Sequence, residues 1–360
     1  MLRKLFASAT LLAGFSTAYS QDSTTTTVEQ KKPNFNITGS IDVFYRYNLS
    51  NPPKEAETFN NYTSFTNSQN SFTFNMASIK LEHSVGKVGG VIDLGYGKRA
   101  DEFSYNDTKS SLIVKQAYLY YTPWKNVKFT AGSWATHIGY ELVDAYLNRN
   151  YSMSYMFSYG PFFNTGLKGE FTVGKSTFML GISDPSDLKY ADFSRKFIIG
   201  QYSTSLAKDA IKLYLNYQGG NANGTAKMNQ IDVVATGALS PKFSIGYNGT
   251  VQMVKAKDDD GKYGDTKNWW GSALYFNVDP KPWFGLTLRG EYFDDKDAVS
   301  GGAFGTNFFE TTLSANFKID GLTIIPEIRY DNSGKEMFTK HDGTTTKSTA
   351  SLLVAAIYHF

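Results

Sequence analysis

Few groups of residues in this chain have the types and spacing needed for bond-making chemistry. The four histidines, His83, His137, His341 and His359, are scattered, and none belongs to an H-E-x-x-H motif. The sequence contains no G-x-S-x-G motif, no phosphate-binding glycine loop, no dinucleotide fingerprint and no cysteine. We therefore predict no catalytic residues, no bound cofactor and no metal site.

Two acidic stretches are the remaining candidates for such chemistry. The run from Asp258 to Asp260, followed by Gly261 and Asp265, offers carboxylates to Ca²⁺. It lacks the full alternating ligand series of a calcium loop, so a solvated acidic turn is the favoured interpretation. The aspartates at positions 294, 295 and 297 could serve a surface protease, but no histidine is assigned near them, which disfavours that interpretation.

A larger set of charged residues alternates with apolar residues in short segments. Asp42 and Arg46, for example, are interleaved with Ile41, Val43 and Tyr45. Because the side chains of a strand point alternately to opposite faces, the charges share one face and the apolar residues share the other. By the same parity, the charged faces of other segments carry Asp93, Lys128, Lys168, Glu170, Lys212, Asp232, Arg289, Glu291, Glu310, Lys318, Glu327 and Arg329. Most of these charges could pair across neighbouring strands, which would leave only a few to meet a solute.

The segment from 136 to 163 combines charge with an unusual density of aromatic residues. Seven Tyr or Phe residues lie between positions 146 and 163. Such a segment is unexpected in water but reasonable if it folds inward and packs on a protein wall. Its candidate constriction residues are Glu141, Asp144, Arg149 and Tyr151. The alternative is a loop that packs over an opening or against a neighbouring subunit.

The elements that position these residues are strands. Apolar residues recur at every second position in sixteen segments of roughly ten residues, the length that a tilted strand needs to cross a membrane. The segments are 36–48, 71–84, 90–98, 111–122, 126–135, 164–174, 176–183, 196–205, 209–218, 229–240, 242–255, 268–279, 283–294, 307–319, 321–331 and 347–360. Counts of fourteen and eighteen are also compatible with the pattern, because the ends of such segments are uncertain by several residues.

The connections between these segments alternate in length. Tight connections such as Gly86-Lys87, Gly174-Lys175 and Asp320-Gly321 follow the even-numbered segments. Longer and more polar connections, such as 49–70 and 136–163, follow the odd-numbered ones. A soluble sandwich has no reason to sort its loops in this way. We therefore predict an all-β protein, a transmembrane antiparallel up-and-down β-barrel with short periplasmic turns and long external loops.

The final segment supports a barrel that closes in a membrane. The even positions from Ala350 to Phe360 are all apolar, while Ser351, Ala355 and His359 point the other way. An aromatic residue at the end of this segment is typical of the girdle at a membrane interface. A last strand that ends in Phe360 also resembles the signal by which the barrel-insertion machinery recognises outer-membrane barrels. The alternative is the edge strand of a soluble sandwich.

The predicted strand number determines what fills the interior. Sixteen strands spaced roughly 4.8 Å apart and tilted by about 40° enclose a cylinder on the order of 30 Å across. Side chains cannot fill that width, so the interior is expected to hold water and to be narrowed by the chain's own loops. A charge that faced lipid at mid-depth would cost roughly 2–4 kcal/mol, so the charged faces are expected to line the lumen.

The N-terminus predicts export. Residues 1–20 carry Arg3 and Lys4, an apolar stretch and Ala18-Tyr19-Ser20, which together indicate a signal peptide. Its removal lowers the formal net charge from +3 to about +1, too balanced for a nucleic-acid partner. No later stretch is apolar for the roughly 18 residues of a transmembrane helix. We expect a flexible periplasmic lead at 21–35 and a barrel domain at 36–360.

Short motifs around the aromatic segment resemble the outer-membrane porins of the beta-barrel porin-2 type (OmpL-like), and the resemblance covers residues 36 to 360. The motifs are Gly132, Thr136, Ile138-Gly139-Tyr140-Glu141, Asn150-Tyr151-Ser152, Tyr155, Pro161 and Thr165-Gly166. The chain differs at Ser133, Met153 and Asn164, where the family often has Lys, Arg and His. The loss of these positive charges weakens any anion preference that the resemblance implies.

The resemblance and the predicted barrel together lead us to expect a porin in the outer membrane of a Gram-negative bacterium. It would admit small hydrophilic solutes by passive diffusion through a lumen narrowed by the inward-folded third external loop. Its expected partners are outer-membrane lipid, the solutes, the insertion machinery and, in a homotrimer, copies of itself. The alternatives are a channel selective for phosphate, sugar or peptide, an outer-membrane enzyme, a non-conducting adhesin barrel and a soluble secreted β protein.

Overall fold

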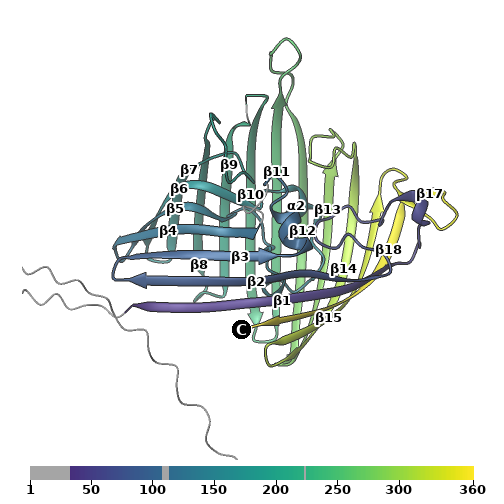
Figure 1. The fold of residues 1–360 in the computed structure, drawn as a ribbon, viewed down its shortest axis with the longest axis horizontal. Coiled ribbons are helices and arrows are strands. Elements are labelled where there is room, and N and C mark those ends of the chain that lie inside the picture. Colours follow the sequence, from purple (N-terminus) through teal and green to yellow (C-terminus); the bar gives the residue numbers. More distant parts are fainter. Residues whose placement is uncertain (1–32, 108–112, 223) are drawn as a thin grey trace, which may run out of the picture. The chain divides into compact units, whose positions relative to one another are not determined.

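The computed structural model describes residues 33–107, 113–222 and 224–360 as an antiparallel barrel (Figure 1). Sixteen strands form one closed sheet in which each strand pairs with its neighbour in the chain. The first strand, β1 (Asn34–Asn48), pairs with the last, β18 (Ser348–His359), and Val43 lies opposite Ala356 in this register. The two short strands β16 and β17 form a separate sheet in the loop between β15 and β18.

The described segments of the chain contain two short α-helices, two 3-10 helices, η1 (Lys54–Ala56) and η3 (Ala145–Leu147), and eighteen strands. The α-helices are α1 (Lys98–Phe103) and α2 (Tyr155–Tyr159), both in external loops. The remaining strands are β2 (Ser71–Val85), β3 (Val88–Tyr96), β4 (Val114–Trp124), β5 (Val127–Ala135), β6 (Phe163–Val173), β7 (Ser176–Ser183), β8 (Phe197–Leu206), β9 (Ile211–Ala222), β10 (Ala226–Ser240), β11 (Phe243–Ala256), β12 (Lys267–Lys281), β13 (Phe284–Asp295), β14 (Thr306–Ile319), β15 (Leu322–Ser333), β16 (Phe338–Thr339) and β17 (Thr345–Thr346).

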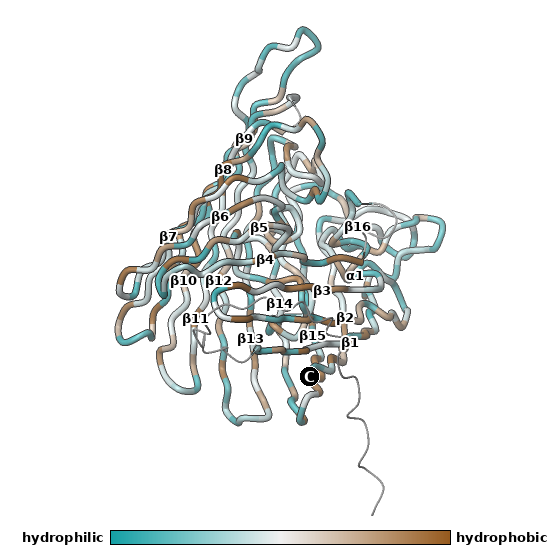
Figure 2. The backbone as a smooth tube through the Cα atoms, turned by 60° about the vertical axis from the view of Figure 1, so that its left-hand side comes forward, coloured by the Kyte–Doolittle hydropathy of each residue, from teal (hydrophilic) through white to brown (hydrophobic). Residues whose placement is uncertain are grey.

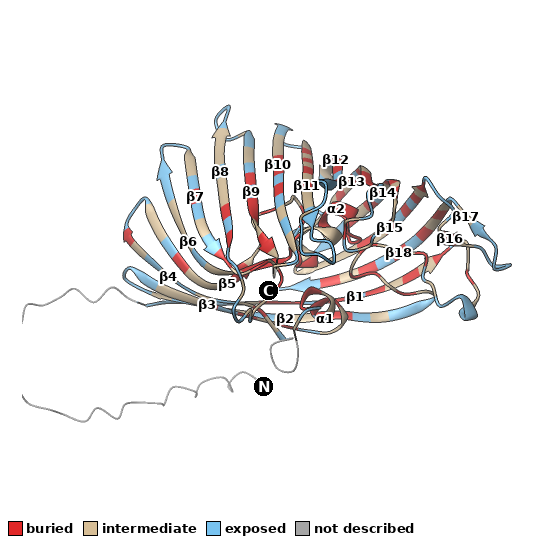
Figure 3. Ribbon diagram, turned by 90° about the horizontal axis from the view of Figure 1, so that it is seen from above, coloured by how far each residue is buried: buried red, intermediate tan, exposed pale blue. Residues whose placement is uncertain are grey.

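The structure confirms the sixteen-stranded barrel expected from the period-two pattern. In β14, Glu310, Thr312 and Ser314 are buried inside the barrel, whereas Phe309 and Leu313 are exposed on its outer face. Figure 3 shows the same alternation of buried and exposed residues along β9 to β15, and Figure 2 shows apolar and hydrophilic residues interleaved along the strands. The outer face is therefore apolar and suited to lipid.

The connections confirm the predicted alternation of short turns and long loops, except between β9 and β10: β9 ends at Ala222 and β10 begins at Ala226, so this external connection is short. Gly86 and Gly174 adopt positive φ angles of 60° and 58° in two of the tight turns, a backbone conformation that glycine adopts without strain. The β11–β12 loop rises furthest above the barrel in Figure 1. The strand β1 begins at Asn34, two residues before the predicted start of the barrel domain. The predicted signal peptide, and the predicted lead as far as residue 32, lie outside the described residues.

The wall of the barrel is uneven in height. The strands β3 to β8 are 8 to 11 residues long, whereas β1, β2, β9 to β15 and β18 are 12 to 15 residues long. Because a strand rises about 3.3 Å per residue, one side of the barrel is lower than the other. No helix within the described ranges is long and apolar enough to cross a membrane.

Candidate functional site

The third external loop, residues 136–162 and called L3 below, runs from β5 into the barrel and returns to β6. It begins by crossing the inner wall: the backbone N–H of Gly139 donates to Asp232 on β10 (3.1 Å) and that of Tyr140 donates to Asn248 on β11 (3.3 Å). The ring of Tyr140 then stacks on Tyr275 of β12 at 4.1 Å between centroids. The helix α2 of L3 lies beside β12 and β13 (Figures 1 and 3).

Arg289 on β13 is the central charged residue of this contact. Its guanidinium donates to Glu141 of L3 (2.6 Å) and to Glu310 on β14 (2.9 Å), and the side chains of both carboxylates are nearly inaccessible. It also donates to the backbone carbonyl of Ser152 (2.7 Å). The buried guanidinium pairs with both carboxylates. Any one of these three charged groups would be costly to bury without a partner.

The wall also binds the backbone of L3. Glu327 accepts from the N–H groups of Tyr151 (2.8 Å) and Ser152 (3.2 Å). Glu291 accepts from the N–H groups of Tyr155 and Met156, both at 2.7 Å, at the start of α2. These carboxylates satisfy backbone donors that would otherwise be unpaired inside the barrel.

L3 is also bound on the side of the lumen that lies opposite β13. The residues there belong to β4, on the low side of the barrel, and to the second external loop, between β3 and β4. Arg99 of α1 is fully buried, donates to the carbonyl of Val143 (2.9 Å) and lies over the rings of Phe65 (4.8 Å) and Tyr151 (5.0 Å). Lys115 on β4 forms an ion pair with Asp144 of L3. L3 is thus attached to strands on both sides of the lumen.

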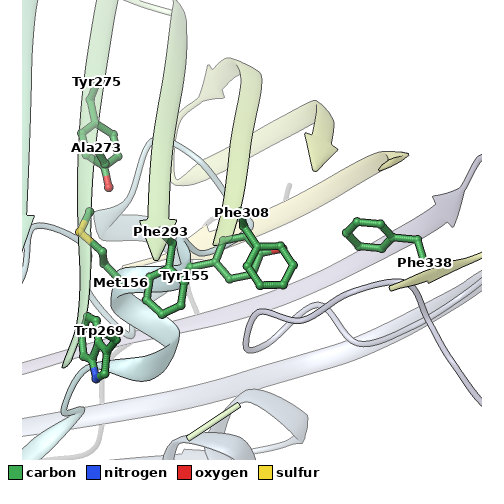
Figure 4. Close-up of a cluster of buried hydrophobic side chains, with 8 residues drawn as sticks. All are labelled: Tyr155, Met156, Trp269, Ala273, Tyr275, Phe293, Phe308 and Phe338. Carbon is green, nitrogen blue, oxygen red and sulfur yellow. The ribbon is translucent and has the colours of Figure 1, made fainter. Parts of the chain in front are cut away.

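Aromatic clusters fill the spaces between L3 and the wall. Figure 4 shows one of them, in which α2 places Tyr155 and Met156 against three strands. The wall residues of this cluster are Trp269, Ala273 and Tyr275 on β12, Phe293 on β13 and Phe308 on β14, and Phe338 lies beside them on β16. The ring of Tyr155 stacks on Phe308 at 4.5 Å. This packing holds L3 inside the barrel by burial of apolar area as well as by charge.

A second cluster uses an apolar patch on the inner face of the closing strands. Phe44, Ile325, Leu353 and Ile357 are buried there against Tyr151 of L3. Sequence reasoning missed this patch, although β18 contained a signal for it. The even-numbered face of β18 is apolar, and its odd-numbered face also carries Leu353 and Ile357. A strand that is apolar on both faces is expected to be buried on both.

The predicted constriction residues occupy distinct environments in L3. Glu141 (5 % exposed) and Asp144 (7 %) form the ion pairs described above, and Tyr151 (0 %) donates through its hydroxyl to Asp42 (2.5 Å). Arg149 is more accessible and forms an ion pair with Asp279 on β12 at 2.7 Å. All four therefore contact the wall, and Arg149, which also donates to Thr287 on β13 (2.8 Å), is the most accessible of them.

The predicted lumen charges divide into two groups. Nine are at most 5 % exposed: Asp42, Arg46, Asp93, Asp232, Arg289, Glu291, Glu310, Glu327 and Arg329. The other five are partly or fully accessible: Lys128, Lys168, Glu170, Lys212 and Lys318. The buried group lies mainly where L3 and the first loop cover the wall. The accessible group lies on β5, β6, β9 and β14, below L3.

Two titratable groups in the loops are shifted by burial. Burial lowers the pKa of His137, whose Nε2 atom lies 3.0 Å from the carbonyl of Tyr217, to about 4, so its imidazole is neutral at pH 7. Burial raises the pKa of Asp187, in the fourth external loop, to about 6. Asp187 accepts from the N–H groups of Phe162 (2.7 Å) and Phe163 (3.0 Å) and thereby holds the end of L3.

No cluster of three or more His, Cys, Asp or Glu residues suited to a metal ion occurs within the described ranges. The aspartates at 258 to 260 lie on an exposed hairpin of the β11–β12 loop. There, Asp258 accepts from the N–H of Lys262 (2.8 Å).

A closed antiparallel barrel of sixteen strands, with an external loop folded into its lumen, defines the class of outer-membrane channels. Residues 34–360 match the family model described as "Putative beta-barrel porin-2, OmpL-like", and the chain belongs to this family. It is an outer-membrane channel of a Gram-negative bacterium that allows passive diffusion. No curated protein matches the chain.

Solved structures with the same fold are distant in sequence. The outer-membrane channel DcaP of Acinetobacter baumannii is 11 % identical with a TM-score of 0.60, and the match covers 91 % of this chain and 97 % of that one. An anion-selective porin from Comamonas acidovorans is 10 % identical (TM-score 0.58; 91 % and 100 % covered). The trimer form of OmpT of Vibrio cholerae is 8 % identical (TM-score 0.58; 91 % and 99 % covered). These similarities show the fold alone.

Proposed function

We propose that small hydrophilic solutes diffuse through this barrel along a lumen that L3 narrows. The observation that carries the proposal is the attachment of L3 to strands around the lumen, from Asp232 on β10 through Arg289 on β13 to Lys115 on β4. A loop attached at so many points reduces the cross-section open to a solute and leaves the barrel wall unchanged.

The test is the conductance of the purified protein in planar lipid bilayers. Replacement of residues 142–153 by a short Gly-Ser linker is expected to raise the single-channel conductance. The matched control replaces residues 258–265 in the exposed β11–β12 loop and is expected to leave the conductance unchanged. A wild-type protein that gives no current would contradict the channel, and an L3 variant with wild-type conductance would contradict the narrowing.

We further propose that the accessible lumen favours small anions weakly. Below L3, the inward-facing side chains outside the contact with L3 include five lysines against two glutamates: Lys80, Lys128, Lys168, Lys212 and Lys318, with Glu82 and Glu170. An excess of fixed positive charge raises the local concentration of anions and lowers that of cations. A solute-selective channel for phosphate, sugar or peptide is the second candidate within this class.

Family and fold favour a channel, and we propose that the protein is not an enzyme. Hydrolysis of lipid or peptide substrates that is lost in His137→Ala or His341→Ala would contradict this proposal. We also propose a homotrimer, supported by the trimer form of the similar OmpT and by an apolar hollow of about 760 Å³ on the outer face of β2 to β5. Cross-linking in native outer membranes tests the trimer, with a monomer-only pattern as the contrary result.

A further inference from the structure

On the external side of L3 lies a hollow of about 780 Å³, called the vestibule below. Its lining includes Tyr105 of the second loop, Tyr159 of L3 and Ser186 of the fourth loop. The inner wall contributes Gln218 on β9 and Gln252 on β11. A volume of this size is within the range of roughly 300–1,000 Å³ that small-molecule sites occupy.

The wall of the vestibule carries a row of amide side chains in fixed orientations. Gln218 accepts from the hydroxyl of Ser186 (2.9 Å) and donates to Gln230 on β10 (3.0 Å). Gln252 donates to Gln230 (3.3 Å) and accepts from the indole N–H of Trp269 (2.9 Å). Each carboxamide has two donor hydrogens and two acceptor lone pairs, so these bonds leave one of each unused on both lining amides, whose small exposed fractions (3 % and 6 %) border the hollow. Because their partners already hold them, little ordering entropy is lost when a solute binds.

Aromatic rings from the loops line the same hollow as the amide row. Tyr105 is 58 % exposed and stands edge-on to Phe162 at 6.1 Å. Tyr159 is half-buried, and its hydroxyl donates to the carbonyl of Tyr62 (2.5 Å), which fixes its ring. Rings and amides in one hollow provide the two contacts that a sugar ring uses: C–H groups pack on an aromatic face while hydroxyls bond to amides.

The charges in the vestibule argue against an ionic ligand. No Lys, Arg or His side chain lines it among the described residues, so an anion would find no counter-charge. Its two carboxylates are already engaged, since Glu102 accepts from the N–H of Phe65 (2.6 Å) and Asp187 accepts from those of Phe162 and Phe163. A peptide would bring charged termini that this lining does not balance.

We propose that the vestibule is a binding site for an uncharged polyhydroxylated solute, of the class of short saccharides, on the external side of the constriction. The proposal rests on the proposed channel function and names a solute class for it. Amides that bond hydroxyls and aromatic rings that pack on C–H faces concentrate the solute above L3 without a charge requirement. The weak anion preference of the lysines below L3 does not act on a neutral solute.

The experiment uses maltotriose as the probe on the full-length protein in planar bilayers. Maltotriose on the external side is expected to block the salt current in a saturable manner. Gln218→Met and Tyr105→Leu are each expected to raise the half-blocking concentration by roughly 2- to 10-fold, because each substitution removes one or two contacts with the solute. The matched control is Asn229→Met, which removes an exposed amide from the outer face of β10 and is expected to leave the block unchanged.

A second readout separates this proposal from the channel itself. Trp269, bonded to Gln252, is expected to change its fluorescence when maltotriose binds, whether or not current flows. Current without either a block or a fluorescence change would overturn the saccharide site and leave the channel standing. A fluorescence response without current would overturn the channel and leave the site. Equal or stronger effects of inorganic phosphate or trialanine, or unchanged binding in Gln218→Met, would overturn the solute class or the placement.

Discussion

At the residue scale, Arg289 joins L3 to the wall through two carboxylates and one carbonyl. Arg289→Met removes the positive charge bonded to Glu141 and leaves Glu310 with the more distant Arg329 at 4.0 Å. Removal of one member of such a buried network costs about 3–5 kcal/mol. We expect a lower unfolding midpoint in detergent and larger current fluctuations from a loosened L3. Lys296→Met, at an exposed ion pair with Asp294, is the control and should change neither. Wild-type behaviour of Arg289→Met would show that L3 does not depend on this contact.

Asp187 makes the attachment of L3 depend on pH. Burial raises its pKa from an ordinary value of 3.8 to about 6, so the folded state holds the proton more tightly than the unfolded one. The resulting stabilisation is complete below pH 3.8 and is lost as the pH rises through 6, a difference of at most about 3 kcal/mol. The facing groups are the Tyr105 hydroxyl, which donates to Asp187, and the nearby charges of Asp107 and Lys189.

We therefore expect the amides of Phe162 and Phe163 to be more protected from hydrogen exchange at pH 5 than at pH 8, after correction for the intrinsic exchange rate. In Asp187→Asn, which cannot ionise, this difference should disappear. Asp258→Asn in the exposed hairpin is the control. Equal protection at both pH values in the wild type would contradict the assignment.

At the element scale, the strands and turns were predictable because their information is local. Period-two alternation marks a strand such as β14 within its own residues, and Gly86 or Asp320 marks a turn by its conformation. The path of L3 is different. Its partners Glu291 and Glu327 lie 136 and 176 positions from the residues they bind, and no local pattern joins them. Arg99, in a polar stretch of the second loop, gave no signal that it would be buried under L3.

The many attachments of L3 predict that it stays in place while solutes pass. The chain has no cysteine, so Asn150→Cys with Ser314→Cys introduces the only possible pair, at a contact of 2.7 Å between L3 and β14. We expect the oxidised and reduced forms to have the same single-channel conductance. Each single-cysteine variant is the control for the effect of substitution. A conductance that falls on oxidation and recovers on reduction would mean that L3 leaves the wall to open the channel.

At the scale of the whole molecule, the distribution of charge matters more than its total. The formal net charge is small, yet the buried acids and arginines are neutralised against L3 while the accessible positions below it are mostly lysines. A passing ion therefore meets an excess of positive charge that the composition does not reveal. Inside a narrow lumen such a field is less screened than on an open surface.

This arrangement predicts the sign of the ion selectivity. In asymmetric KCl, the wild-type reversal potential is expected to indicate a weak preference for chloride. Lys128→Gln with Lys168→Gln removes two lysines on adjacent strands, on β5 and β6, and should move the reversal potential toward cation preference. Lys175→Gln, in an exposed turn outside the lumen and paired with Asp209, is the matched control. The double variant and the control should both keep the pore size. Their conductance at high salt should therefore change little, because salt screens the fixed charges under that condition. A cation-selective wild type, or a double variant with an unchanged reversal potential, would contradict the role of these lysines.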